Sequence, residues 1–142
     1  MKKLFLLSAA LLVAATIFCG CSKDDDGKLS EASIVGEWNL TKCNGYQSNI
    51  DGSNKESYND DCRGDNIRLR FEKDGTGMLK EGGAAWCDFH YEVNGNILRI
   101  DYVDRSADEY TIEKLTAKEL ILYQYEESGY IIWARHLYYE RK

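Results

Sequence analysis

The chain has 142 residues, no proline and a formal net charge of −6. Once a leader of about twenty residues is set aside, this length allows one domain, which buries a core without needing a metal or a disulfide. The acidic balance, with no basic stripe, argues against nucleic acid and anionic lipid as partners. Ten tyrosines and three tryptophans crowd toward the C-terminal half, as in strand-rich proteins.

Residues 1–20 have the features of a secretory leader, with a lysine pair followed by an apolar stretch over residues 4–18. That stretch is short for a membrane span. The leader ends in Phe-Cys-Gly-Cys, which resembles the lipobox of bacterial lipoproteins, with the small Gly20 before Cys21. The resemblance implies lipidation of Cys21 and stable membrane attachment through its acyl chains. Cys19 is the alternative acceptor, but a bulky phenylalanine precedes it.

Residues 21–33 are expected to form the lipidated cysteine and a disordered acidic tether. The run Ser-Lys-Asp-Asp-Asp-Gly that follows Cys21 contains no apolar side chain. One interpretation is a solvated spacer. The other rests on its resemblance to the surface-export signal of lipoproteins from the Bacteroides group. That resemblance implies an outer-membrane lipoprotein exposed at the cell surface.

From residue 34 to residue 142 the pattern predicts eight strands and one domain. The first strand is expected at 35–43, and a polar loop rich in Asn, Asp, Ser and Gly follows at 44–64. In the second strand, at 65–72, apolar residues alternate strictly with charged ones. The remaining strands are expected at 76–80, 86–93, 97–103, 109–115, 119–126 and 130–140.

Two regions test this assignment. Asp74-Gly75 and Asn94-Gly95 supply the positive φ angles of tight hairpin turns, which favours an antiparallel meander. Residues 111–122 contain good helix formers, so a helix is the alternative there, although alternating apolar residues favour two strands. Eight strands joined in sequence predict an all-β fold, a single antiparallel up-and-down barrel. Such a barrel is either filled by side chains or holds one small ligand.

Three motifs resemble the lipocalin-like domains common in lipoproteins of the Bacteroides group. They are the Gly-Glu-Trp that ends at Trp38, the strand that ends in Asp-Gly-Thr-Gly, and the segment 93–100. The resemblance covers residues 34–142 and implies a lipocalin-like barrel. In lipocalins this tryptophan closes one barrel end beneath an arginine of the last strand, which implies that Arg141 covers Trp38. Such a cation over an indole contributes about 1 kcal/mol, so both residues are expected to be structural.

Alternating strand directions place the tight turns at one end of the barrel and the longer connections at the other. The longer connections are residues 44–64, 81–85, 104–107 and 127–129. This second end is the predicted mouth, where loops displayed by a rigid scaffold usually carry function. The residues expected to line a ligand there are Trp86, His90, Tyr102, Tyr123 and Trp133. Aromatic residues on strands are also common in cores, so a filled interior is the alternative.

The three cysteines Cys43, Cys62 and Cys87 are also predicted at the mouth. An exported domain meets an oxidising compartment, which favours one disulfide and one free thiol. The spacing of Cys62 and Cys87 resembles that usual in the lipocalin-like lipoproteins, which implies that these two pair. The bond would stabilise the fold by about 3.5 kcal/mol in the loop-entropy account. Cys43 with Cys62 is the alternative pairing.

The sequence contains no catalytic constellation, so we expect no enzyme. His90 and His136 have no nucleophile in a recognised motif beside them. The carboxylates of Asp60, Asp61 and Asp65 lack the spacing of a calcium loop. A zinc site built from the cysteines and His90 has no C-x-x-C spacing to support it. We therefore expect no cofactor and no metal.

Two functional hypotheses remain. In the first, a membrane-anchored lipoprotein at the cell surface binds a small apolar or glycan-type ligand in the mouth of its barrel. In the second, the barrel is filled and the domain is a protein-interaction or inhibitory module that contacts partners through the loop 44–64. The interior volume discriminates between the two.

Surface display is tested by treating intact cells with a protease. We expect cleavage of the domain while soluble periplasmic proteins stay protected, because the tether would hold the domain outside the outer membrane. An intact domain beside protected periplasmic controls would count against display.

Overall fold

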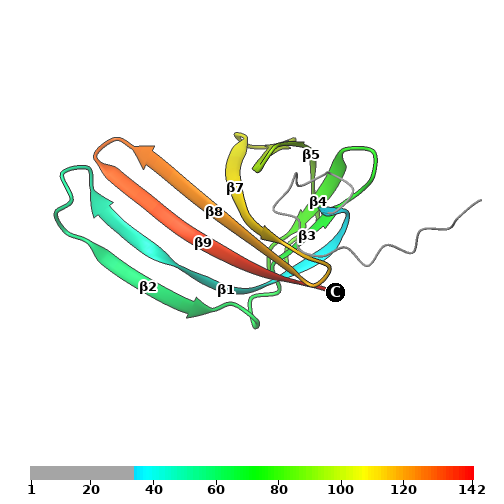
Figure 1. Cartoon of the computed structure of the whole chain (residues 1–142), viewed down its shortest axis with the longest axis horizontal. Helices are drawn as coiled ribbons and strands as arrows, with labels where there is room; N and C mark the ends of the chain where they lie inside the picture. Colours follow the sequence, from blue (N-terminus) through cyan, green and yellow to red (C-terminus); the bar gives the residue numbers. More distant parts are fainter. Residues whose placement is uncertain (1–33) are drawn as a thin grey trace, which may run out of the picture.

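The structure, a computed structural model, describes residues 34–142, and all of its elements are strands (Figure 1). They are β1 Gly36–Asn49, β2 Glu56–Asp61, β3 Arg68–Phe71, β4 Thr76–Lys80, β5 Cys87–Asn94, β6 Ile97–Tyr102, β7 Asp108–Leu115, β8 Glu119–Ser128 and β9 Ile131–Arg141. Eight of the nine strands, all except β2, follow one another around a closed antiparallel barrel, which the β1–β9 pairing completes. The predicted all-β up-and-down barrel is therefore confirmed, and β7 and β8 occupy the region of the alternative helix.

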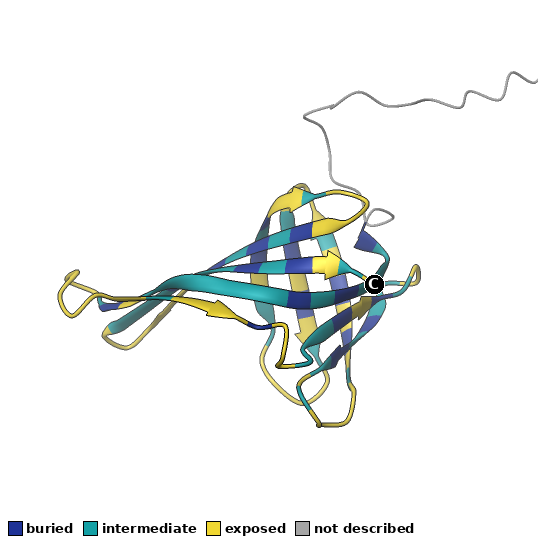
Figure 2. Ribbon diagram, turned by 90° about the horizontal axis from the view of Figure 1, so that it is seen from below, coloured by how far each residue is buried: buried dark blue, intermediate teal, exposed yellow. Residues whose placement is uncertain are grey.

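On one of its two sides, strand β1 pairs with a different strand along each half of its length. Residues 36–39 pair with β3, residues 42–47 pair with β2, and on its other side β1 pairs with β9 from Trp38 to Asn49. A register shift between Leu40 and Lys42 marks the change. Beyond it, β2, β1, β9 and β8 continue as a four-stranded sheet that projects from the barrel (Figures 1 and 2). We call this extension, residues 42–61 and 123–136, the arm.

The expected polar loop at 44–64 is a strand hairpin over most of its length. β1 continues to Asn49, and β2 pairs with it through six consecutive residue pairs. At the tip, Asp51 Oδ1 accepts hydrogen bonds from the backbone N and the Oγ of Ser53, at 2.9 and 2.6 Å. The β1–β2 hairpin was not predicted because β2 is almost entirely exposed and lacks the usual alternation of apolar and polar residues.

The core lies inside the barrel, where buried inward residues alternate with more exposed ones along strands such as β5 and β6 (Figure 2). The rings of Phe71 and Phe89 meet edge to face with centroids 5.5 Å apart, and Phe71 and Tyr91 do so at 4.9 Å. Ile67 is partly buried, and Leu69 and Phe71 are buried, as their alternation predicted. The largest fully buried side chains are those of Trp38, Phe71, Phe89, Ile34, Leu98, Ile100, Leu120 and Leu122.

Trp38 closes the end of the barrel opposite the mouth. Its side chain is fully buried, and its Nε1 donates to the Ile34 carbonyl at 2.7 Å. The Arg141 guanidinium lies 4.2 Å from the indole ring, and its Nη1 donates to the Val35 carbonyl at 2.7 Å. The predicted contact between Trp38 and Arg141 is confirmed. Gly36 is required beside it, because its φ of +136° is unfavourable for other residues and a Cβ would lie 2.5 Å from Arg141 Nη1.

The predicted leader, tether and lipidated Cys21 lie outside the described residues. Between residues 34 and 142, no helix is long and apolar enough to cross a bilayer.

We expect Arg141→Ala to lower the free energy of unfolding by about 1 to 2 kcal/mol, because it removes the cation over Trp38 and a hydrogen bond to Val35. Urea denaturation measures this change. Lys142→Ala is the matched control: its Nζ is 3.1 Å from Glu37 Oε1, but its side chain is 57% exposed, so the cost should stay below about 1 kcal/mol. Equal losses in the two variants would contradict a closing role for Arg141.

Candidate functional site

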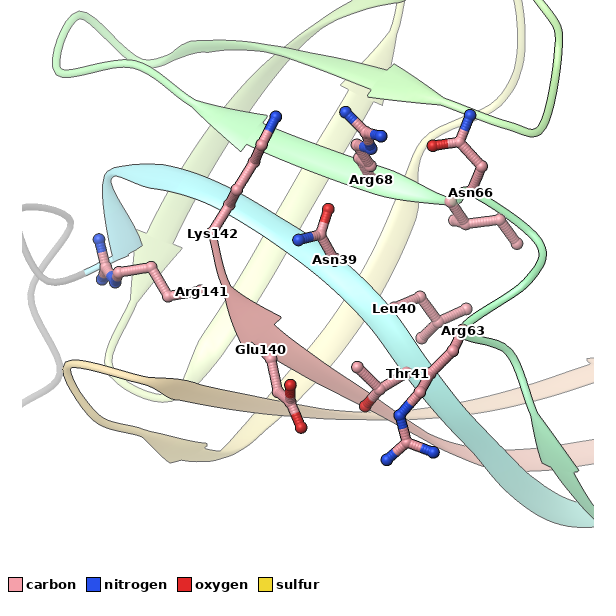
Figure 3. A pocket seen from close by; sticks show the side chains of 10 residues that line it. Asn39, Leu40, Thr41, Arg63, Asn66, Arg68, Glu140, Arg141 and Lys142 are labelled. Carbon is pink, nitrogen blue, oxygen red and sulfur yellow. The ribbon is translucent and has the colours of Figure 1, made fainter.

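The structure has a large surface groove where β1 leaves β3 and joins β2 (Figure 3). Its volume is about 330 Å³. It is lined by Asn39, Leu40, Thr41, Arg63, Asn66, Ile67, Arg68, Glu140, Arg141 and Lys142. The four cationic side chains in this set raise the question of an anion site.

Three of the four cationic side chains of this groove already form ion pairs, and the four do not converge on one position. Arg68 and Lys142 both bind Glu37 Oε1, at 3.4 and 3.1 Å. Arg63 pairs with Asp61 at 3.1 Å, and Arg141 points away from the groove toward the closed end (Figure 3). The groove is therefore a poor receptor for an anion.

A second hollow, the mouth cavity, lies inside the barrel at the end away from Trp38 and has a volume of about 150 Å³. Leu40, Leu69, Leu79 and Leu137 form its apolar wall, and Ile67 adjoins them. The remaining lining side chains are those of Tyr102, Tyr110, Tyr139, Glu81, Arg105, Asp108 and Arg135. The hollow thus combines a leucine wall with a small set of polar groups, which is the usual composition of a ligand site.

The polar groups on one side of the mouth cavity are joined by hydrogen bonds. Asp108 accepts from the Tyr110 hydroxyl at 3.1 Å and from Gln124 Nε2 at 3.4 Å. The Gln124 carbonyl oxygen accepts from Arg135 Nε at 2.8 Å. Since Gln124 is only 6% exposed, it is fixed between the two charged side chains.

A separate pair forms the rim of the cavity. The Arg105 guanidinium lies 4.2 Å from the ring centroid of Tyr102, and its Nη2 is 3.5 Å from Glu81 Oε2. These residues come from the two connections predicted to form the mouth, after β4 and after β6. The predicted mouth is therefore confirmed for the connections 81–85 and 104–107, whereas most of the segment 44–64 and all of the segment 127–129, also predicted there, belong to the arm.

Burial governs the titration of the tyrosines around the cavity. It raises the pKa of Tyr102 to about 12, and it raises the pKa of Tyr110 and Tyr139 as well. The positive charge of Arg135 partly offsets the rise in pKa for Tyr110 and Tyr139, and also for Cys43 and Tyr58, whose pKa values burial raises. Arg135 is thus central to this polar region.

Of the five residues predicted to line a ligand, Tyr102 lies in the cavity wall. Trp86 is at the mouth, 37% exposed, with Lys80 Nζ 5.6 Å from its ring centroid. His90 is exposed on the outer face of β5, between the inward Phe89 and Tyr91. His90 therefore does not line the cavity.

The other two predicted residues lie on β8 and β9, away from the cavity. Tyr123 is on the outer face, where its ring centroid is 4.9 Å from that of His136. His136 also lies 3.3 Å from Glu113. Trp133 is on the arm, and its Nε1 donates to Gln47 Oε1 at 3.0 Å. The structure does not bring these two aromatic residues together with Tyr102.

The predicted disulfide between Cys62 and Cys87 is corrected by the structure, in which Cys43, Cys62 and Cys87 are free thiols. Cys62 N donates to the Thr41 carbonyl, so Cys62 lies beside β1, and β3 and β4 separate it from Cys87 on β5. Cys87 Sγ instead donates to Asp104 at 3.1 Å. Cys62 lies on the same face of the β1–β2 pair as Cys43, and the alternative pairing of these two stays a prediction.

The sequence pattern did not identify Arg135, Asp108 and Gln124 as site residues. A signal was present for Arg135, because it has the same parity along β9 as the inward Leu137 and Tyr139. Gln124 likewise follows Leu122 by two residues. Within residues 34–142, no group of three or more His, Cys, Asp or Glu side chains is placed to hold a metal ion.

The profile of the lipocalin-like domain family matches residues 34–122, from the closed end into β8. The chain belongs to the lipocalin-like domain family. Members of this family are generally non-catalytic binding proteins. No match was found among curated proteins.

Two solved structures resemble this lipocalin-like domain. A lipocalin-like protein from Bacteroides uniformis matches with a TM-score of 0.51 and 16% identity, over 78% of this chain and 99% of that one. An uncharacterized protein from Bacteroides eggerthii matches with a TM-score of 0.48 and 14% identity, over 76% of this chain and 98% of that one. At such identities the similarity to the first protein concerns the fold alone.

We expect the stability of the domain to fall as the pH rises from about 10 toward 12. Over this range the unfolded chain releases the Tyr102 proton, whereas the folded protein, with a pKa of about 12 at Tyr102, retains it. Urea denaturation at several pH values, together with phenolate absorbance, measures the effect. Tyr102→Phe should reduce the slope, and the 83% exposed Tyr130, changed to Phe, should leave it unaltered. A slope unchanged by Tyr102→Phe would contradict the assignment.

Proposed function

We propose that this lipocalin-like domain binds one small ligand with an apolar body in the mouth cavity. The observation that supports the proposal is the mouth cavity itself, where a leucine wall faces a hydrogen-bonded set of polar side chains. Its volume of about 150 Å³ is close to that of an apolar cavity able to hold benzene. The ligand body therefore corresponds to a single six-membered ring or a short chain.

The composition of the wall favours an apolar body over a glycan. Leu69, Leu79 and Leu137 offer no hydrogen bonds, so sugar hydroxyl groups placed against them would lose their water partners without replacement. The polar side chains lie on the β7–β8–β9 side and at the rim. A ligand would thus be oriented with its apolar part toward the leucines and a polar group toward Arg135.

We also propose that the domain is a lipid-anchored surface lipoprotein, on the basis of the lipobox-like sequence before Cys21 and the acidic run after it. Ile34, where the described part begins, lies against Trp38 at the closed end. An anchor preceding it would leave the mouth facing away from the membrane, where a ligand has free access.

A second candidate function is protein interaction through the arm. Its tip exposes Ile50 and Tyr130, which are 53% and 83% accessible, and Tyr125, which is 48% accessible, lies further along β8. Ile50 N donates to the Tyr130 carbonyl, so the two turns of the tip act as one surface. Clustered exposed apolar residues of this kind favour a partner. Occupation of the mouth cavity discriminates between the two functions.

Methyl NMR with benzyl alcohol, a neutral probe, tests cavity binding. We expect shifts of the methyl signals of Leu69, Leu79 and Leu137, because these side chains line the mouth cavity. The buried methyl groups of Leu98 and Leu120, which do not line it, serve as internal controls. Saturating probe with no shift at the lining leucines would exclude the cavity as a binding site and favour the arm.

A further inference from the structure

Arg135 differs from the other cation of the mouth cavity in its partners. Arg105 pairs with Glu81, whereas Arg135 forms no ion pair with any residue from 34 to 142. The one side-chain hydrogen bond of Arg135 within this part of the chain is that from Nε to the Gln124 side-chain carbonyl oxygen, at 2.8 Å. Its two Nη groups therefore remain available, while the bond to Gln124 holds the guanidinium in a fixed orientation.

The Asp108 carboxylate does not neutralise the positive charge of Arg135 by direct contact. Its two oxygens already accept hydrogen bonds from Tyr110 and from Gln124, so Gln124 lies between the anion and the cation. A cationic ligand at Asp108 would have to compete with these donors. An anionic ligand at Arg135 would meet unused donors, which makes Arg135 the stronger receptor of the two.

The surroundings of Arg135 also match an anion with an apolar body. Arg135, Leu137 and Tyr139 lie on one face of β9 at two-residue spacing, about 7 Å apart along the strand. A group bound to the Nη atoms therefore has the leucine wall within the length of a small molecule. A guanidinium forms two parallel hydrogen bonds with a carboxylate, which sets both its position and its direction.

We propose that the ligand of the mouth cavity is a small organic monocarboxylate, with an apolar part about the size of a benzene ring and its carboxylate bound to the Nη groups of Arg135. This inference rests on the proposed function and specifies the chemistry of the ligand. Arg135 supplies the charge, Gln124 orients the guanidinium, and Leu69, Leu79 and Leu137 contact the apolar part.

Three probes of similar shape and different charge test the inference: benzoate, benzamide and benzylamine. Calorimetry and methyl NMR on the native domain give their affinities and sites. Benzoate should bind at least about tenfold more tightly than benzamide, since hydrogen bonds between charged groups exceed those to a neutral amide by at least about 1.4 kcal/mol in a partly buried site. The affinity of benzoate should also fall as salt increases.

Arg135→Gln should abolish the preference for benzoate over benzamide. The matched control is Arg99→Gln, which removes a cation that lies outside the mouth cavity and is paired with Asp101 at 2.7 Å, and it should retain the preference. Thermal melting verifies that both variants fold. Where Arg135→Gln does not fold, Arg135→Lys retains the charge without the paired donors and should lose most of the preference.

The outcomes separate the inference from the proposed function. Equal affinity for benzoate and benzamide in the cavity would overturn the anion site and leave cavity binding intact. Tighter binding of benzylamine would overturn it in favour of a cation site at Asp108. If none of the three probes, nor benzyl alcohol, shifted the methyl signals of the lining leucines, the proposed function itself would fail.

Discussion

The pairing of β1 with β9 is the constraint on which the rest of the structure depends. It runs from Trp38 opposite Arg141 to Asn49 opposite Ile131, longer than the barrel needs. Its first part closes the sheet and leaves no open edge among the eight barrel strands. Its second part continues outside the barrel, where β2 and β8 join it as the arm. The pairing of β1 with β9 thus contributes to both the barrel and the arm.

The same pairing positions the polar side of the mouth cavity. Where β9 passes from the arm into the barrel, its inward residues change from Trp133 and Arg135 to Leu137 and Tyr139. Gly45 lies opposite Arg135, and a Cβ there would be 2.1 Å from the Ala134 carbonyl oxygen, so only glycine allows the two strands to approach so closely. Arg135 therefore sits at the boundary between solvent and the leucine wall, where a charged group keeps part of its hydration.

Much of the barrel could be predicted from the sequence, because its strands have one buried face. The alternation around Leu69, the two turns at Gly75 and Gly95, and the closure of Trp38 by Arg141 all follow from local rules or from family resemblance. The β1–β2 hairpin of the arm could not be predicted in the same way. Strand β2 is almost entirely exposed, so its residues carry no periodic apolar signal.

The site was less predictable than the fold because residue type is a weaker guide than strand parity. His90 and Tyr123 suggested a ligand site by their chemistry, yet each is one residue out of phase with the inward positions. Arg135 occupies an inward position of the alternation along β9, but it is charged. A charged residue on a strand is ordinarily assigned to the outer face of the barrel. The pairing of Cys62 was misjudged for a related reason, since β2 carries it to the side of β1.

Closure by the first and last strands also has a consequence for the folding pathway. The residues that join in β1 and β9 are about 80 to 100 positions apart in the sequence, and such non-local pairing slows folding to the order of milliseconds to seconds. The barrel therefore cannot close until β9 has been synthesised, because β1 has no other partner along that side. Until the last strand arrives, the edge of β1 stays open to other chains.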